Sequence, residues 1–228
     1  MCKRTNGDNI ISVFKDSLLI DSADLAEKCA DTGVSFIDNQ IIQRIPIISL
    51  LLGTVKVGVD ICRMVVCHNF SRFITRVRAG EATDIEIKEH LNKLDSPKKL
   101  NEELGMIAVY LQKNTADIKN DIFAAIYVSF IKKQILYDDL CELFEITDRL
   151  FVKDIDLMHE IATFNQISGK GQEHQLQRLQ SLGLVQISHK VGDLITLSAE
   201  ETLESIRVGY YFTELGQLFY EYLSIIES

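Results

Sequence analysis

The sequence predicts a mainly α-helical protein, a helical bundle followed by a small α+β module. Proline and glycine are scarce, with two prolines and twelve glycines in 228 residues, against usual shares of about 5% and about 7%. Apolar residues recur at steps of three and four along most of the chain, which is the spacing of a helix face. After residue 171 the pattern changes, and from Leu184 to His189 the apolar residues alternate, as they do in strands.

The N-terminal region is expected to contain two long helical stretches. Residues 10–32 carry good helix formers, and Gly33 suits the position that follows a helix. In residues 46–78, Pro46 suits a first helical turn, and one apolar stripe runs through the whole segment. A break near His68 would divide this segment into two helices.

Residues 81–167 are predicted to form an acidic bundle. Thr83 is placed to cap one helix, and Ser96 with Pro97 begins the next. The expected helices cover residues 84–94, 97–113, a stretch opened by Thr115, 138–151 and 154–167. Connections of two to six residues favour antiparallel neighbours.

The last part of the chain alternates between helix and strand patterns. Its expected elements are a helix over 172–182, a strand over 184–189, a turn over 190–193, a strand over 194–197, a strand over 210–213 and a helix over 214–226 capped by Thr213. A polar linker around 168–171 precedes them. We therefore expect three regions, 1–80, 81–167 and 168–228.

Charge is distributed unevenly along the chain. The net charge is −9, from 24 basic and 33 acidic residues, which argues against a general nucleic-acid coat protein because phosphate contacts need cations. Residues 41–80 nevertheless hold six basic residues and one acidic residue, a net charge of +5. The basic residues are Arg44, Lys56, Arg63, Arg72, Arg76 and Arg78.

Two interpretations of this basic segment remain open. In the first, it is a core helix whose cations pair with acidic residues of the bundle. In the second, it is an amphipathic helix that contacts a protein partner or an anionic membrane surface. The second would place a cytoplasmic protein at the inner face of the membrane. The most apolar run, from Ile45 to Val55, has 11 uncharged residues, too few for the about 20 that a spanning helix needs.

Motifs that carry chemistry are missing from the sequence. The five cysteines include no C-x-x-C pair, which is typical of reduced thiols in the cytosol. The N-terminus has no apolar signal region. The sequence also has no glycine-rich phosphate-binding loop, no G-x-S-x-G nucleophile elbow of a hydrolase and no cysteine or histidine spacing typical of zinc ligands. We therefore expect no catalytic residues, no metal, no cofactor and no small-molecule substrate, and we do not expect an enzyme.

The C-terminal pattern resembles a winged-helix module. The residues that carry the resemblance are Leu176-Gln-Arg-Leu-Gln-Ser-Leu-Gly-Leu-Val185 and Tyr210-Tyr-Phe-Thr-Glu-Leu-Gly216. The resemblance implies a recognition helix in the first run, with Gln175, Arg178 and Gln180 as nucleic-acid contacts. Residues 171–228 carry three basic and eight acidic residues, a net charge of −5, which is unfavourable for DNA. The other interpretation is a winged helix that binds protein.

The order of the segments is similar to that of a set of uncharacterised bacterial proteins, some of which resemble Abi-alpha-like abortive-infection proteins. The similarity rests on the run from Ile45 to Val55, Phe70-Ser-Arg-Phe-Ile-Thr-Arg-Val77, Tyr137-Asp-Asp-Leu140 and Leu150-Phe-Val-Lys-Asp-Ile-Asp-Leu157. It implies a bacterial cytosolic protein with a role in phage defence. It supplies no functional residues.

The sequence thus favours a non-enzymatic protein that acts through protein–protein or membrane-surface contacts, with a partner protein or a second copy of itself. The alternative is a winged-helix regulator that binds DNA.

Overall fold

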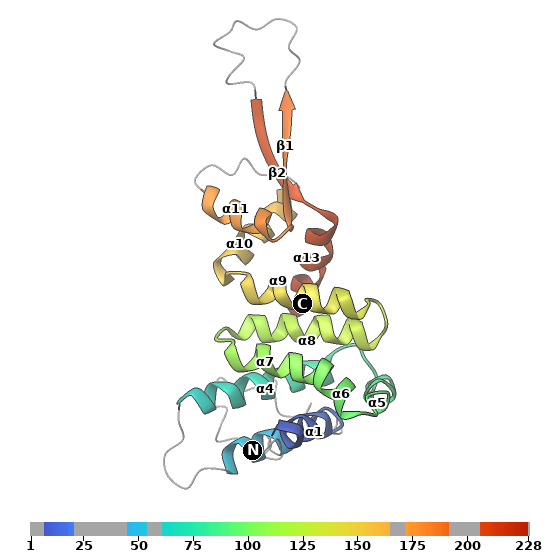
Figure 1. Cartoon of the computed structure of the whole chain (residues 1–228). Coiled ribbons are helices and arrows are strands. Elements are labelled where there is room, and N and C mark those ends of the chain that lie inside the picture. The colour runs from blue at the N-terminus through green and yellow to red at the C-terminus, as the bar shows by residue number, and fades with distance from the viewer. Residues whose placement is uncertain (1–6, 21–44, 54–60, 165–171, 192–205, 228) are drawn as a thin grey trace, which may run out of the picture. The chain divides into compact units, whose positions relative to one another are not determined.

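The structure is a computed structural model, and it describes residues 7–20, 45–53, 61–164, 172–191 and 206–227. These residues form a mainly helical protein with a small two-stranded sheet. The elements are α1 (Gly7–Leu18), α3 (Pro46–Gly53), α4 (Ile61–Ala79), α5 (Asp84–Asn92), α6 (Pro97–Leu100), the π-helical turn η2 (Asn101–Gly105), α7 (Met106–Lys113), α8 (Asp117–Ile131), α9 (Tyr137–Arg149), α10 (Val152–Phe164), α11 (Glu173–Ser181), β1 (Val185–Val191), β2 (Ile206–Phe212) and α13 (Glu214–Glu227) (Figure 1).

The chain divides into two compact units, Met1–Phe144 and Glu145–Ser228. From the sequence, boundaries were expected near residues 80 and 168. The structure joins the first two regions, because α4 packs along α8 and α7. It also assigns α10 to the second unit, because α10 packs against α11 and β2.

The core of the first unit includes the apolar face of α4. Phe70 and Phe73 are buried on this helix. The Phe70 ring meets Phe14 of α1 edge-on, with 4.9 Å between centroids, and Phe73 lies 5.8 Å from Tyr127 of α8. Aromatic pairs at these separations add to the free energy of burial. The predicted apolar stripe is therefore part of the protein core at Phe70 and Phe73.

Local sequence determines where several helices begin. Thr83 forms a reciprocal capping box with Glu86, and Ser96 caps α6 with Pro97 in its first turn, as predicted. The helix expected over 97–113 is interrupted by η2. The prediction that Thr115 opens the next helix is wrong, because α8 begins at Asp117 without a side-chain cap.

One other predicted detail of the first unit differs from the structure. α4 continues through His68, so the break considered there is not formed. The helix expected over 10–32 is described only as α1, since residues 21–44 lie outside the described residues.

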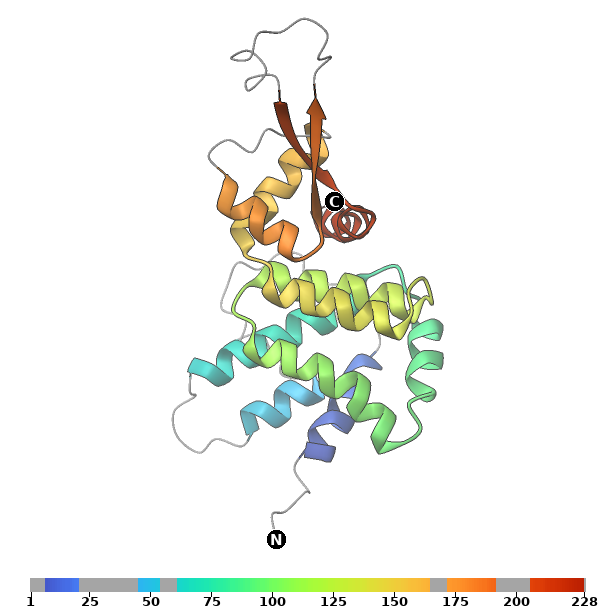
Figure 2. The same cartoon turned by 45° about the horizontal axis from the view of Figure 1, so that its top comes forward.

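The second unit has a long antiparallel ribbon. β1 pairs with β2 from Val185 opposite Phe212 to Val191 opposite Ile206, and Figure 2 shows this ribbon projecting beyond α10, α11 and α13. The turn predicted over 190–193 is wrong for its first two residues, which extend β1. The strand predicted over 194–197 lies outside the described residues.

The junction between β2 and α13 follows the predicted pattern. Thr213 Oγ1 accepts a hydrogen bond from the Gly216 amide at 2.9 Å and donates to the Gly183 carbonyl at 2.6 Å. Thr213 is thus the N-cap of α13, as predicted. Gly183 has φ +73°, a conformation that favours glycine, where α11 turns into β1.

Candidate functional site

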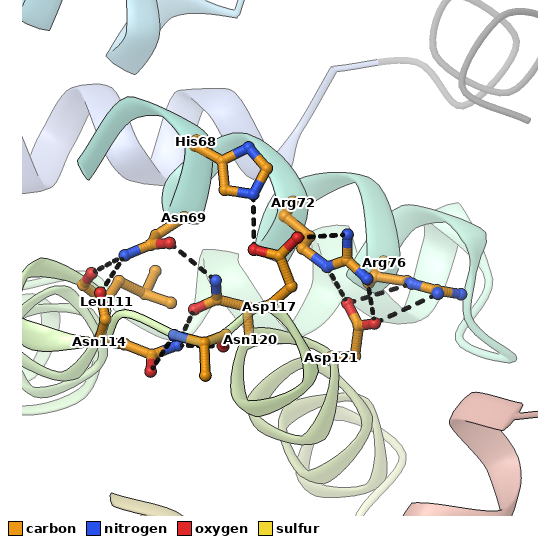
Figure 3. Close-up of polar contacts among 10 residues, drawn as sticks. His68, Asn69, Arg72, Arg76, Leu111, Asn114, Asp117, Asn120 and Asp121 are labelled. Atoms are coloured by element: carbon orange, nitrogen blue, oxygen red, sulfur yellow. Dashed lines mark hydrogen bonds and ion pairs between the residues drawn. The ribbon is translucent and has the colours of Figure 1, made fainter. Parts of the chain in front are cut away.

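Two arginines of α4 meet one buried carboxylate of α8. Asp121 has only 5% of its side chain exposed. Arg72 donates from Nε and Nη2 to its two oxygens at 2.7 and 2.6 Å, and Arg76 contacts the same oxygens at 3.2 Å (Figure 3). These hydrogen bonds raise the pKa of the Arg72 guanidinium. The contact fixes α4 on α8, because breaking a buried ion pair costs about 3–5 kcal/mol.

The row of charges continues to Asp117, the first residue of α8. Its carboxylate lies 2.7 Å from His68 Nε2 and 3.3 Å from Arg72 Nη1. An acidic residue in the first turn also interacts favourably with the helix dipole. His68, Asp117, Arg72, Asp121 and Arg76 therefore form one ladder of alternating partners between the two helices.

A chain of amides lies beside this ladder. Asn69 donates to the carbonyls of Leu111 and Asn114, each at 2.8 Å, and accepts from Asn120 Nδ2 at 2.9 Å. Asn114 in turn donates to Asn120 Oδ1 at 2.7 Å. The three amides are buried. A polar network whose members satisfy one another specifies packing, and it leaves these groups little capacity for a ligand.

Arg78 is buried at the end of α4. Its Nη2 lies 2.6 Å from Asp84 of α5, and 4% of its side chain is exposed. The Nη1 group lies 3.5 Å from the Leu18 carbonyl, and Nε has no hydrogen-bond partner among the described residues. Arg78 therefore ties the ends of three helices together.

The described arginines of the basic segment bear on its two interpretations. Arg72, Arg76 and Arg78 pair with carboxylates inside the first unit, and this agrees with the core-helix interpretation. The second interpretation, a membrane or partner contact through these arginines, stays a prediction. Arg44 and Lys56 lie outside the described residues, as does the side chain of Arg63.

In the second unit, Arg178 is likewise paired with a buried carboxylate. Its Nε donates to Asp154 Oδ2 at 2.9 Å, and its Nη2 donates to Asp154 Oδ1. Asp154 is fully buried in α10, and its hydrogen bond raises the pKa of the Arg178 guanidinium. A residue expected to contact nucleic acid thus joins α11 to α10.

The other two predicted nucleic-acid contacts, Gln175 and Gln180, lie on the same helix but differ in their surroundings. Gln175 Nε2 donates to the Lys153 carbonyl at 3.0 Å, which is a second link between α11 and α10. Gln180 is exposed. The structure therefore does not bring the three predicted residues together as one exposed cluster.

An exposed apolar face lies beside Arg178 instead. Phe151 and Val152, where α10 begins, are 60% and 46% exposed. The Arg178 guanidinium lies 4.8 Å from the centre of the Phe151 ring, and Lys153 beside them is exposed. We call Phe151, Val152, Lys153 and Arg178 the α10 face. This face was not predicted from the sequence, which placed Phe151 at the end of one expected helix and Val152 in the connection to the next.

The Arg178 guanidinium retains capacity for a second acceptor. A guanidinium has five N–H donors, and two of them are directed at Asp154. Within the described part of the chain no other acceptor contacts this guanidinium, and 36% of its side chain is exposed beside the Phe151 ring. Aromatic and arginine side chains dominate the binding energy of many protein interfaces.

A second polar cluster surrounds η2 in the first unit. Glu103 Oε1 accepts from Tyr127 at 2.7 Å and lies 2.8 Å from His90 Nε2. Burial is the main cause that raises the pKa of Tyr127 well above its usual value. The Glu103 and Tyr127 side chains are buried. The contacts with Tyr127 and His90 therefore stabilise the buried Glu103 carboxylate on the π-helical turn. The cluster has no exposed reactive group.

Among the described residues, no helix is long and apolar enough to cross a membrane, and no group of three potential ligands could hold a metal ion. Comparison of the chain with protein-family models, curated proteins and solved structures finds no match.

Proposed function

We propose that this chain is a non-enzymatic interaction protein whose second unit binds a protein partner through the α10 face. One observation carries the proposal. Phe151 is 60% exposed, yet the Arg178 guanidinium lies over its ring and the buried Asp154 holds that guanidinium. An aromatic ring and an arginine held in this way lose little side-chain freedom on binding, which favours affinity.

The first unit supports a different role in this proposal. Its described arginines form ion pairs within the unit, and the apolar residues Phe70, Phe73 and Val77 are buried. A membrane-surface helix would need its apolar face and its cations available at the same time. These contacts favour the first unit as a scaffold over a membrane-surface role for the described part of α4.

We further propose that α10, α11, β1, β2 and α13 form a winged-helix-like module. The order of elements supports it, since two helices are followed by a ribbon and a final helix capped by Thr213. In such a module α11 would be the recognition helix. Its only arginine, Arg178, is paired with Asp154, which favours protein over DNA as the ligand of this module.

A DNA-binding regulator is the second candidate, because the element order and the exposed Gln177 and Gln180 favour it. Fluorescence anisotropy with a diverse duplex pool at low salt separates the two candidates. The first predicts no salt-dependent binding. Binding that weakens steeply with salt and is reduced by Gln180→Ala would support the second. The role in phage defence stays an expectation from the family resemblance.

Partner capture tests the first candidate. Tagged full-length protein is recovered from its cells of origin as wild type, as Phe151→Ser and as Ile85→Ser. Ile85 is a matched control, because it is 70% exposed in the first turn of α5 and belongs to the first unit, whereas the α10 face belongs to the second. We expect a reproducible partner that Phe151→Ser loses and Ile85→Ser retains. Equal recovery by all three proteins would contradict a role for the α10 face.

A further inference from the structure

A second exposed apolar cluster lies at the start of α9. Leu136 is 75% exposed and Tyr137 is 39% exposed, and Asp138 beside them is exposed. The cluster is held in place by two hydrogen bonds: Tyr137 donates to the Glu102 carbonyl at 3.0 Å, and Asp139 accepts from the Leu136 amide at 2.8 Å. We call Leu136, Tyr137 and Asp138 the α9 ledge.

The α9 ledge and the α10 face are chemically complementary. Each presents two exposed apolar residues at adjacent positions. The ledge adds the carboxylate of Asp138, whereas the face adds the ammonium of Lys153 and the outer donors of Arg178. Complementary charges around an apolar centre favour correct pairing and disfavour the pairing of like with like.

The two surfaces are made of different residues, the ledge in the first unit and the face in the second. The ledge lies where α9 begins, and Phe151 follows two residues after α9 ends. A copy that uses its ledge to bind the face of another copy still has its own face available. Contacts between two different surfaces are heterologous, and they produce rings or open chains of subunits.

Building on the proposed function of the α10 face, we propose that its partner is a second copy of this chain, bound head to tail through the α9 ledge. Each contact involves a few side chains, so the affinity is modest and association depends on concentration. The proposal names the partner class for the face, and it assigns a function to a ledge that the rest of the fold does not use.

Sedimentation velocity of the full chain up to about 1 mM tests the proposal, because that range reaches the weakest specific contacts. Two variants each remove one surface, Leu136→Ser and Phe151→Ser. Both residues directly precede the first residue of a helix, where serine is a favoured N-cap, so we expect both variants to fold. Each should weaken self-association about tenfold or more. Ile85→Ser is the matched control and should associate like wild type.

Mixing the two variants gives the sharper result. Leu136→Ser retains its face and Phe151→Ser retains its ledge, so one intact contact forms between them. We expect an equimolar mixture to form a 1:1 dimer that does not grow further, while each variant alone stays monomeric. A wild type that is monomeric throughout, or a mixture that forms no dimer, overturns the proposal. If partner capture still depends on Phe151 in that case, the proposed function stands and only the identity of the partner is wrong.

Discussion

Arg72 and Asp121 form a two-point ion pair between α4 and α8, with both carboxylate oxygens within 2.7 Å of the guanidinium. We expect a double-mutant cycle on Arg72→Ala and Asp121→Ala to give a coupling energy of about 1–3 kcal/mol in urea unfolding. Asp121→Ala alone should cost about 3 kcal/mol, because Arg72 and Arg76 both lose their buried partner.

Arg149 and Glu145 supply the control for this cycle. They form an i,i+4 pair on α9 with side chains 65% and 55% exposed. Exposed pairs of this kind contribute about 0.5 kcal/mol or less. A coupling between Arg72 and Asp121 no larger than that of the control pair would show that the charge ladder does not hold α4 in place.

Asn120 connects the buried amide chain, and Asn120→Ala tests it. The substitution leaves the Oδ1 of Asn69 and the Nδ2 of Asn114 without one hydrogen-bond partner each. We expect a loss of about 2 kcal/mol in the free energy of unfolding, since unsatisfied buried groups cost about 1–3 kcal/mol. Urea unfolding with an unchanged m-value measures it. A loss below about 0.5 kcal/mol would mean that water or a shifted side chain replaces the amide.

Gly216 allows α13 to approach the start of β1. A Cβ atom at this position would lie 1.9 Å from the Leu184 carbonyl oxygen, so the backbone would have to move. We expect Gly216→Ala to lower the free energy of unfolding of the second unit by about 1–3 kcal/mol. Gly105→Ala is the control, because its nearest neighbours lie at 3.8 Å. Equal thermal stability of both variants would contradict the close approach.

Tyr137 gives a prediction about alkaline pH. Partial burial raises the pKa of Tyr137 to about 12, whereas a phenol in the unfolded chain ionises near 10. Between about pH 10 and 12 the unfolded state therefore releases a proton that the folded state keeps, and the free energy of unfolding falls as pH rises.

We expect Tyr137→Phe to show a shallower fall in stability over this interval than wild type, measured by urea unfolding at a series of pH values. Tyr127 keeps its own contribution in both proteins, because its pKa is also raised. The same slope in both proteins would exclude Tyr137 as a source of alkaline sensitivity.

Local sequence predicted much of the fold, because caps and periodicity depend on neighbouring residues. Thr83, Ser96 and Thr213 are N-caps as expected. The π-helical turn was not predicted, since its Glu103 is stabilised by Tyr127, 24 residues away. A strand was expected over 210–213, within the later part of β2, but its earlier start and its pairing with β1 were not predicted, because register over a long connection depends on tertiary pairing.

The candidate site was less predictable. The positive charge of residues 41–80 singled out Arg72 and Arg76 as candidate contact residues. Only the structure shows that both form ion pairs with Asp121. Arg178 was identified by its place in a helix, and its bond to Asp154 depends on how α10 packs against α11. Exposure of Phe151 cannot be read from its neighbours, because the same pattern also fits a buried residue.

The central claim is that the α4 arginines maintain the fold while the α10 face makes the contact. Thermal unfolding and partner recovery, measured together on Asp121→Ala and Phe151→Ser, test it most directly. We predict that Asp121→Ala lowers the unfolding temperature clearly, while Phe151→Ser leaves it nearly unchanged and abolishes partner recovery. A Phe151→Ser protein that recovers the partner like wild type, or an Asp121→Ala protein as stable as wild type, would contradict the account.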